Sequence, residues 1–487
     1  MQLQQLLSYL PFYRLIGEGN PTITALEQNH KQVKEGCLWF CIKGENVDGH
    51  LFAKDAVNNG ASAVVCEYEL DIDVPQIIVN DSKRAMAILA SAYYQHPSTS
   101  MTVIGVTGTN GKTSTSHFID AILRYTGRKT GLIGTMYTKI DNETFETKNT
   151  TPDSLTLQKT FKDMVNKKVD SVIMEVSSHA LHQGRVWGTD FNIAVFTNLT
   201  QDHLDYHKTM EEYKRAKSLL FSQLGNSYNG YSEKFAVLNS DEEASEFFAK
   251  CTAAPVIRYG IKNDAEIKAE NIKMNQKGSS FDLVTPLGTV RIETKLIGLF
   301  NIYNLLAAAT VGWLLKLPLA DIKEAISTIK GVAGRFELVD ENQPFPVIVD
   351  YAHTPDGLEN VLKTVRELAK NRIFVVVGCG GDRDKTKRPK MAEIACLFAT
   401  DPVFTSDNPR SEDPIQIIKD MEEGVKGKKY KVIPDRKEAI RYAIENANEG
   451  DVVLIAGKGH ETYQIIGDQV LSFDDRLVAS NAIKNLK

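Results

Sequence analysis

The sequence predicts an α/β protein with mostly parallel sheets and three domains. Apolar runs of strand length alternate with helical patterns over most of the chain, which is typical of parallel sheets covered by helices. The 487 residues suit about three domains of ~150 residues each. Polar or glycine-rich segments directly follow several apolar runs, where open α/β sheets bind ligands. We place the domains at residues 1–98, 99–330 and 331–487.

Composition and charge limit the classes of function. Hydrophobic residues make up 42% of the chain and charged residues 24%, as in ordinary globular proteins. The net charge of -5 argues against nucleic acid as the main partner but leaves room for local anion pockets. No apolar run reaches ~18 residues and no signal-peptide pattern opens the chain, so we expect a cytoplasmic protein without membrane insertion. The six cysteines form no C-x-x-C pair and fit reduced thiols.

The first domain reads as a small α/β unit, and the second as a larger one. In the first, the sequence predicts a helix over 81–95 and strands at 37–42, 63–66 and 76–79. In the second, it predicts strands at 102–107, 171–176, 193–199 and 235–238, antiparallel hairpins within 264–296, and a buried helix over 301–315.

The segment Thr102–Thr115 predicts a phosphate site. A buried strand leads into the turn Gly108–Gly111, and Lys112 and Thr113 open a helix, so that backbone N–H groups and the helix dipole converge on an anion. Lys112 suits the β- and γ-phosphates of ATP, and the Thr113 hydroxyl suits Mg²⁺. Val106 stands where the strict P-loop pattern has glycine. A chance glycine turn is the alternative, but the order of elements favours a P-loop-type ATPase domain.

Several polar residues of the second domain have two interpretations. Glu175 lies near the end of a predicted strand and His203 follows another, and both suit Mg²⁺. His203, four residues before His207, also fits a loop or capping role. Lys217 lies in a predicted helix, where a solvated surface lysine is the ordinary interpretation. Asn301, near the start of the apolar helix, also fits a capping role.

The third domain again alternates strands and helices, which predicts a Rossmann-like sheet after a joint at Gly331–Gly334. Arg335 and Asp350 flank its first strand and could face a nucleotide. The segment Gly378–Lys385 is a basic glycine turn that fits either carboxylate or phosphate recognition or a solvated loop. The predicted strands are 347–350, 373–378, 403–405 and 452–456.

Two further segments of this domain suggest an amino acid as a substrate. Arg410, in Asp407-Asn408-Pro409-Arg410, offers a rigid fork for a carboxylate. Glu461, in the segment Gly457–Glu461, offers a negative partner for an amine. A cationic fork and an anion at neighbouring strand ends suit a zwitterion.

The chain resembles the Mur ligases, the ATP-dependent enzymes that add amino acids in peptidoglycan synthesis. The resemblance covers essentially the whole chain and rests on many motifs in the same order. They are GVTGTNGKTS (105–114), NTTP (149–152), EVSSHAL (175–181), NLTQDHLDYH (198–207), YKRAK (213–217), FNIYN (300–304), GRFE (334–337), DYAHTP (350–355), GGDRDKTKRP (380–389), DNPR (407–410) and GKGHE (457–461).

The resemblance implies a role for each candidate residue. Lys112, Glu175, His203 and Lys217 would be catalytic, with Lys217 carbamylated and Thr113, Glu175, His203 and Lys217 serving Mg²⁺. ATP would contact Gly108, Thr109, Asn110, Gly111, Lys112, Thr113, Ser114, Asn301, Arg335 and Asp350. A UDP-muramyl dipeptide, bound in part by the first domain, would contact His30, Thr150, Thr151, Ser177, Gln183 and Arg185. The acceptor amino acid would contact Arg383, Asp407, Asn408, Pro409, Arg410, Gly457 and Glu461.

The acceptor implied by DNPR is meso-diaminopimelate, because Mur ligases that add L-lysine usually lack this arginine. The first domain departs from the family, since Asn29-His30-Lys31 stands where D-S-R is usual. We expect a monomer acting on small molecules. The alternatives are the same ligase using L-lysine, a folylpolyglutamate-type ligase and a catalytically idle nucleotide-binding scaffold.

Overall fold

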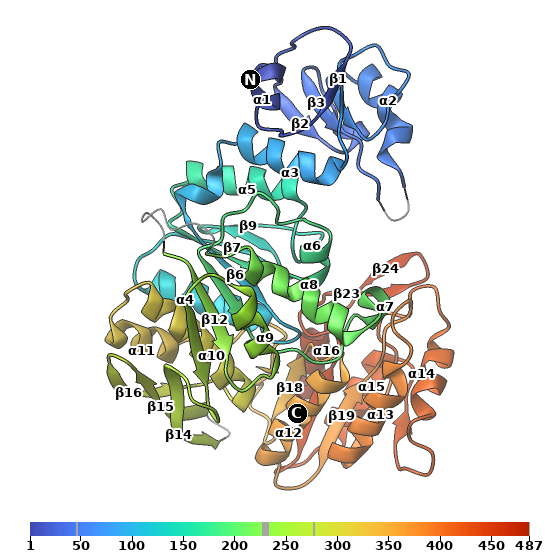
Figure 1. Ribbon diagram of the computed structural model, residues 1–487. Coiled ribbons are helices and arrows are strands. Elements are labelled where there is room, and N and C mark those ends of the chain that lie inside the picture. Colours follow the sequence, from blue (N-terminus) through green and yellow to red (C-terminus); the bar gives the residue numbers. More distant parts are fainter. Residues whose placement is uncertain (45–46, 226–232, 276–277, 487) are drawn as a thin grey trace. The chain divides into compact units, whose positions relative to one another are not determined.

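The computed structural model describes residues 1–44, 47–225, 233–275 and 278–486, and Figure 1 shows their helices and strands. By proximity of their Cα atoms they form two compact units. The first unit comprises Met1–Thr107, Gly127–Ala194 and Leu219–Phe235, and the second comprises Gly108–Thr126, Val195–Ser218 and Ala236–Lys487. The three domain ranges expected from sequence stay a prediction, and each unit is described by itself. In the described residues no helix is long and apolar enough to cross a membrane.

The first unit begins with a five-stranded sheet in the order β1-β5-β4-β3-β2. Its inner pairings are parallel and β1 is antiparallel, which matches the small α/β unit expected there. The sequence did not reveal the shortest elements, β1, β2, α1 and α2, because a few residues carry too little periodicity. The elements are α1 (Leu3–Leu7), β1 (Arg14–Ile16), β2 (Ala25–Glu27), β3 (Cys37–Phe40), α2 (Ala53–Asn58), β4 (Ala61–Cys66), β5 (Gln76–Ile78) and α3 (Ser82–Tyr93).

A second group of strands in this unit runs in the order β6-β10-β7-β8-β9. The pairs β6–β10 and β10–β7 are parallel, and their register places Glu175 opposite Val106 at the carboxyl end of β10. Polar groups past these strand ends therefore gather at one edge of the sheet. The elements are β6 (Thr102–Thr107), β7 (Thr130–Ile133), β8 (Thr138–Ile140), β9 (Glu143–Phe145), α5 (Ser154–Asn166), β10 (Ser171–Glu175) and α6 (Ser178–His182).

The second unit contains the predicted antiparallel hairpins and the buried helix. Strands β14, β15 and β16 pair antiparallel, and the turn at Pro286 and Leu287 joins the last two, as the sequence predicts. Helix α10 is almost wholly buried. The elements are α4 (Lys112–Tyr125), α7 (Leu204–His207), α9 (Ala244–Cys251), β13 (Val256–Gly260), β14 (Ile267–Asn275), β15 (Gly278–Thr285), β16 (Gly288–Thr294), α10 (Leu299–Leu314) and α11 (Leu319–Thr328). Three further elements have residues in both units: β11 (Ile193–Phe196), α8 (Met210–Ser222) and β12 (Phe235–Asn239).

The rest of the second unit is a six-stranded sheet in the order β17-β18-β22-β19-β20-β21, coloured orange to red in Figure 1. All its pairings are parallel except that of β17. Apolar residues of α12, α13 and α14 cover one face, and those of α15 and α16 cover the other, giving the expected doubly wound arrangement. The elements are β17 (Glu337–Leu338), β18 (Val347–Asp350), α12 (Pro355–Leu368), β19 (Ile373–Val377), α13 (Lys387–Phe398), β20 (Asp401–Phe404), α14 (Pro414–Glu422), β21 (Lys431–Val432), α15 (Arg436–Glu445), β22 (Val452–Ala456), β23 (Tyr463–Ile466), β24 (Gln469–Ser472) and α16 (Asp475–Lys484).

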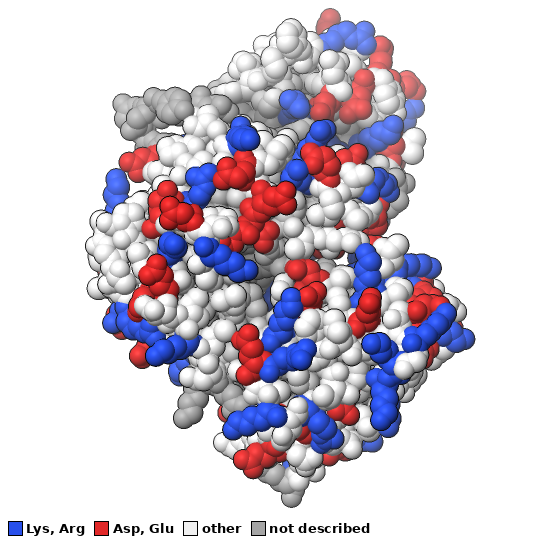
Figure 2. Space-filling view, turned by 60° about the horizontal axis from the view of Figure 1, so that its bottom comes forward, with Lys and Arg blue, Asp and Glu red and all other residues white. Residues whose placement is uncertain are grey.

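A fully buried ion pair joins α15 to α16 in this part of the unit. Arg436 donates from Nε and an Nη atom to the two carboxylate oxygens of Asp475, at 2.8 and 2.7 Å, and both side chains have no exposed surface. Surface pairs are different: Figure 2 shows basic and acidic side chains interspersed over one face, and pairs such as Lys363–Glu359 are half exposed. Only the buried pair would leave an unsolvated charge when one partner is removed.

We expect Arg436→Met to lower the free energy of unfolding by about 3–5 kcal/mol, because Asp475 would stay buried without its partner. The matched control Lys363→Met should cost less than ~0.5 kcal/mol, since water screens the exposed pair. Urea unfolding of the two variants measures the difference. Equal losses in both would contradict the structural role of Arg436.

Candidate active site

The turn Gly108–Gly111 has the backbone shape of a phosphate cradle. Gly108 and Gly111 have φ of 151° and 82°, and α4 begins immediately after the turn. A Cβ atom on Gly108 would collide with the Thr197 hydroxyl, and one on Gly111 would lie 2.5 Å from the side-chain amide oxygen of Asn304. Gly111 is the N-cap of α4 and supplies no side-chain oxygen, so the N-terminus of the helix stays suited to an external anion.

Strand β11, which precedes the loop of His203, is shorter than the sequence predicts. The predicted strand 193–199 ends at Phe196, because the next residues bond to the cradle. The Asn198 carbonyl accepts from the Thr109 N–H at 2.9 Å, and its side chain accepts from the Asn110 N–H at 2.8 Å. Thr197, whose hydroxyl donates to the Asn110 carbonyl, and Asn198 therefore hold the cradle instead of extending the sheet.

Two lysine ammonium groups converge on one carbonyl oxygen of the cradle. Lys112 donates to the Gly108 and Thr109 carbonyls at 2.9 and 2.8 Å, and Lys217 donates to the Gly108 carbonyl at 2.8 Å. Lys217 is 1% exposed and lies over the Tyr213 ring, so it is not a surface lysine. Burial, and then the adjacent Lys112 ammonium, lower the pKa of Lys217 well below its ordinary value. A neutral amine is the nucleophilic form.

His203 lies in the loop between β11 and α7, and its ring is 6.0 Å from that of Tyr213. It adopts φ of 56°, directly precedes α7 and places Nε2 3.3 Å from Asp202. Burial opposes ionisation of Asp202, but His203, His353 and Lys387 outweigh it and hold its pKa below the ordinary value. His203 thus contacts a carboxylate that the sequence interpretation did not include. Among the described residues, no group of three His, Cys, Asp or Glu side chains gathers as a metal site.

Arg335 connects the joint to the cradle. One Nη atom donates to the Thr113 hydroxyl at 3.0 Å, and the guanidinium lies 4.4 Å from the centre of the Tyr351 ring. Within the described chain, Nε of Arg335 and Nδ1 of the nearby His460 are buried without a hydrogen-bond partner. Two unsatisfied polar atoms beside an aromatic ring are suited to a nucleotide.

Asp350 and Asn301, which are also predicted to contact the nucleotide, bond to backbone groups in this structure. Asp350 accepts from the N–H groups of Phe336 and Ala352, both at 2.7 Å. Burial raises the pKa of Asp350 to about 6, against the effect of Arg335. Asn301 donates from Nδ2 to the Ile297 carbonyl at 2.9 Å, and α10 has no side-chain cap, so the capping alternative is wrong. Their contact with a nucleotide stays a prediction.

Asp356 is a site residue that sequence reasoning missed. Its carboxylate accepts from the Asn110 amide at 2.9 Å and from the Thr200 hydroxyl at 3.1 Å, and so it holds the cradle from α12. An acidic residue in the first turn of a helix is ordinarily a partner of the helix dipole, and that signal masked its role here.

Glu175 is described within the first unit, where it forms a hydroxyl network. Its carboxylate accepts from the Thr135 N–H at 2.9 Å and from the Thr135 hydroxyl at 3.1 Å. The Thr135 hydroxyl also bonds to that of Thr150 at 3.0 Å. Thr135 therefore joins two predicted residues, although no motif pointed to it.

Two of the predicted muramyl-peptide residues, Gln183 and Arg185, line a cavity of about 300 Å³ in the first unit. Gln183 accepts two bonds from Arg185, whose other Nη atom donates to the Thr151 carbonyl at 3.1 Å. The Ser177 N–H donates to the Thr151 hydroxyl, completing this set. His30 stacks on Phe52 at 4.5 Å, and the residues that line the cavity are Gln28, Ile42, Gly44, Lys83, Met86, Asp153, Ser154, Gln183, Gly184 and Arg185. Substrate contact by His30 stays a prediction.

The predicted acceptor residues come together at the carboxyl ends of β20 and β22. Asn408 donates from Nδ2 to Glu461 Oε2 at 2.9 Å, and the buried Lys458, which the sequence interpretation did not single out, donates to the same oxygen at 2.8 Å. Arg410 donates to the Gly381 carbonyl at 2.7 Å and has φ of 51°. A non-glycine residue held in this region is strained, as at many functional sites.

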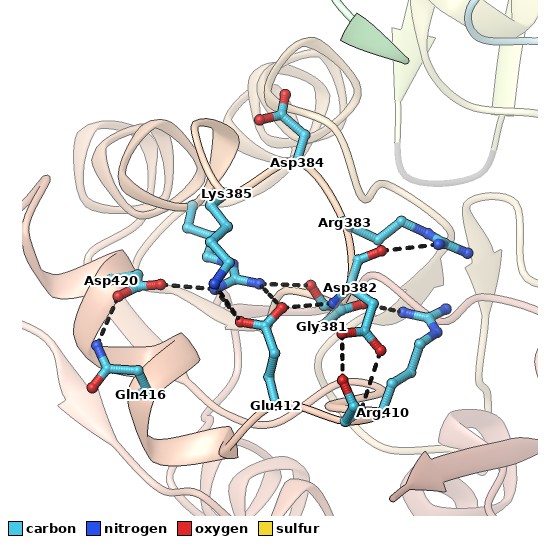
Figure 3. Close-up of polar contacts among 12 residues, drawn as sticks. Gly381, Asp382, Arg383, Asp384, Lys385, Arg410, Glu412, Gln416 and Asp420 are labelled. Carbon is cyan, nitrogen blue, oxygen red and sulfur yellow. Dashed lines mark hydrogen bonds and ion pairs between the residues drawn. The ribbon is translucent and has the colours of Figure 1, made fainter. Parts of the chain in front are cut away.

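The basic glycine turn divides into structural and accessible side chains (Figure 3). Arg388 is completely buried and binds both oxygens of Glu412, and Lys385 binds Glu412 at 3.1 Å. The Arg388 guanidinium holds the pKa of Glu412 at about 2. Arg383 is exposed beside a cavity of about 340 Å³ and donates only to the neighbouring Asp382 carbonyl among the described residues. The turn is thus neither wholly solvated nor wholly a ligand site.

Family models match three consecutive parts of the chain. The Mur ligase catalytic-domain model matches residues 22–94, the Mur ligase middle-domain model matches 106–312, and the Mur ligase glutamate-ligase-domain model matches 334–459. These matches follow the same order as the motifs. They support a small α/β domain, a P-loop-type domain and a Rossmann-like domain.

Relatives match over the full length. UDP-N-acetylmuramoyl-L-alanyl-D-glutamate--2,6-diaminopimelate ligase of Bacillus licheniformis is 61% identical over 490 residues, covering 100% of both chains. A solved structure of a ligase of that name has a TM-score of 0.72 and 33% identity over 99% of this chain and 98% of its own. MurF of Thermotoga maritima in complex with ADP, at 18% identity, shows the same fold with a TM-score of 0.63 over 95% of this chain and 96% of its own. The ordered motifs, the fold and these matches agree, and the chain belongs to the Mur ligase family.

Proposed function

We propose that this protein is an ATP-dependent ligase that joins meso-diaminopimelate to UDP-N-acetylmuramoyl-L-alanyl-D-glutamate in peptidoglycan synthesis. The observation that carries the proposal is the presence of the Arg410 guanidinium and the Glu461 carboxylate at neighbouring strand ends, with Glu461 bonded to the buried Asn408. The name of the relative at 61% identity supports the same acceptor. Such a nucleotide-linked substrate places the reaction in the cytoplasm.

The cradle fits the phosphates of ATP and an accompanying Mg²⁺. The N-terminus of α4 and the Lys112 ammonium would bind the β- and γ-phosphates. The Thr113 hydroxyl, His203 and a carbamate on Lys217 would hold Mg²⁺, because oxygen donors predominate in this set. Glu175 is proposed as a further ligand on the strength of the family motif. Bound Mg²⁺ would neutralise negative charge on the transferring phosphoryl group.

The proposed reaction has two chemical steps. The side-chain carboxylate of the D-glutamyl residue attacks the γ-phosphorus of ATP, which gives an acyl phosphate and ADP, while Lys112 and the cradle N–H groups stabilise the developing charge. The neutral amine of the acceptor then attacks the acyl carbon. Phosphate leaves, the nitrogen loses a proton, and an amide forms. Arg410 and Glu461 would hold the far end of the acceptor during this step.

Lys217 is well suited to carbamylation. The lowered pKa favours the neutral amine, which is the form that attacks CO₂. The amine nitrogen bonds to the carbon of CO₂ and loses one proton, and the resulting carbamate would place an anion beside the Lys112 ammonium. That anion would pair with Lys112 and supply an oxygen ligand.

Selection of the acceptor follows from hydrogen-bond satisfaction. Diaminopimelate carries a carboxylate and an amine at its far end, and lysine carries the amine alone. With lysine, the Arg410 fork would lose its partner at a cost of about 1–3 kcal/mol, which is a factor of about 5–150 in kcat/KM.

The decisive experiment measures phosphate release with ATP, the UDP-muramyl dipeptide and either acceptor. We expect release with meso-diaminopimelate and about 5–150-fold lower kcat/KM with L-lysine. Equal use of lysine would refute the acceptor assignment. Turnover with folate and glutamate would support a folylpolyglutamate-type ligase, and ATP binding without acceptor-dependent release would support an idle scaffold.

Arg410→Ala should raise the KM for diaminopimelate by at least about tenfold and leave the KM for ATP within about twofold. The reason is that only the acceptor is proposed to contact the fork. Arg410→Lys, which keeps the charge but not the fork, should lie between the wild type and Arg410→Ala. A parallel rise in both KM values would remove Arg410 from acceptor selection.

Lys217→Ala and Lys217→Arg should both abolish ligation, since neither side chain can become a carbamate. Formate or acetate should restore part of the activity of Lys217→Ala by placing a carboxylate in the vacated space, but not that of Lys217→Arg, which leaves no such space. Phosphate release measures both effects. Near-normal turnover of either variant without added carboxylate would exclude Lys217 from the mechanism.

A further inference from the structure

Lys458 is a buried cation beside the proposed acceptor site. It directly follows Gly457 at the carboxyl end of β22, and its side chain has no exposed surface. Its ammonium donates to Glu461 Oε2 at 2.8 Å and to Asn408 Oδ1 at 3.0 Å. A buried lysine is costly unless such partners satisfy it, so this group has been placed against two residues of the site.

The contacts of Lys458 determine the orientation of the Asn408 amide. An ammonium group only donates hydrogen bonds, so the atom of Asn408 that faces it must be the carbonyl oxygen. The Ile465 N–H donates to the same oxygen at 3.0 Å. The amide nitrogen is thereby turned toward Glu461, to which it donates at 2.9 Å. Lys458, Asn408 and Glu461 form a closed triangle with one allowed arrangement.

This triangle uses only half of the Glu461 carboxylate. Both donors go to Oε2, and among the described residues no hydrogen bond is made to Oε1. The side chain remains 14% exposed. One oxygen of a carboxylate that an internal ammonium already neutralises is therefore left for an incoming amine.

We propose that Lys458 is a positioning residue that determines specificity for the acceptor, an inference that rests on the proposed function. By neutralising Glu461 and occupying one of its oxygens, Lys458 weakens the attraction of the site for an amino acid whose far end is a bare ammonium. An acceptor whose far end also carries a carboxylate binds because Arg410 supplies the second contact. Lys458 thus discriminates against L-lysine as the acceptor, because it already neutralises the Glu461 carboxylate that the ammonium of L-lysine would need.

The test compares the wild type with Lys458→Met, a side chain of similar length without charge. We expect the KM for diaminopimelate to rise by at least about tenfold, with the KM values for ATP and the UDP-muramyl dipeptide within about twofold. The ratio of kcat/KM for diaminopimelate to that for L-lysine should fall by at least about tenfold, because Glu461 regains its full charge. This ratio is a quantity that general loss of structure would not change.

The chain offers a matched control at the opposite end of the same sheet. Arg372 binds the buried Asp451 at 2.9 Å, just before β19 and β22 begin. Arg372→Met should lower the melting temperature and leave both the KM for diaminopimelate and the acceptor ratio unchanged. A similar kinetic change in this control would assign the effect of Lys458→Met to stability and overturn the proposal.

Two further outcomes decide the matter. An unchanged acceptor ratio in Lys458→Met, or an equal rise in all three KM values, would overturn the proposal. If Lys458→Met does not fold, Lys458→Gln carries the same test, since its amide keeps one donor for Glu461 without the charge. The proposed function fails separately, if the wild type itself releases no phosphate with diaminopimelate.

Discussion

The Gly108 carbonyl oxygen is the point on which the nucleotide half of the site depends. It accepts hydrogen bonds from Lys112 and from the buried Lys217, which brings the two side-chain nitrogens close together. Burial, and then the adjacent Lys112 ammonium, disfavour a charge on Lys217 and lower its pKa. One carbonyl thus brings together the lysine proposed to bind phosphate and the lysine proposed to be carbamylated, provided that Gly108 keeps a φ that other residues rarely adopt.

The acceptor half depends on a different constraint, the shared direction of parallel strands. Strands β18, β22, β19 and β20 end at one edge, so the loops after them meet although they are far apart in sequence. That convergence joins Asn408 to Glu461 across 53 residues of chain. The strained backbone of Arg410 is held by bonds to Ile465 and Gly467 of the β23–β24 hairpin. The parallel sheet thus brings the loops together, and the hairpin holds the backbone of Arg410.

Many elements of the fold could be predicted from the sequence, because they depend on local patterns of residues. The turn before Lys112, the buried strands and the hairpins after residue 264 all carry short-range signals of composition and periodicity. The contacts that sequence reasoning missed are long-range. Asp356 looks like a helix-dipole partner, Thr135 belongs to no motif, and nothing local distinguishes the buried Lys458 from a solvated lysine. Such roles are set by tertiary contact alone.

The hydrogen-bond partners of the buried basic side chains indicate which of them stabilise the fold and which could bind a ligand. Arg436 and Arg388 each face carboxylates that take several of their donors, so they brace helices and offer little to a ligand. Lys217 faces a carbonyl and a second cation without a carboxylate to bind it, and burial together with Lys112 lowers its pKa. Lys458 lies between these cases: it has a carboxylate partner, but Glu461 keeps one oxygen uncommitted. An ion pair in which one carboxylate oxygen has no donor can act as a recognition element. The remaining oxygen can accept a hydrogen bond from a substrate of the right charge, and few other groups would suit it.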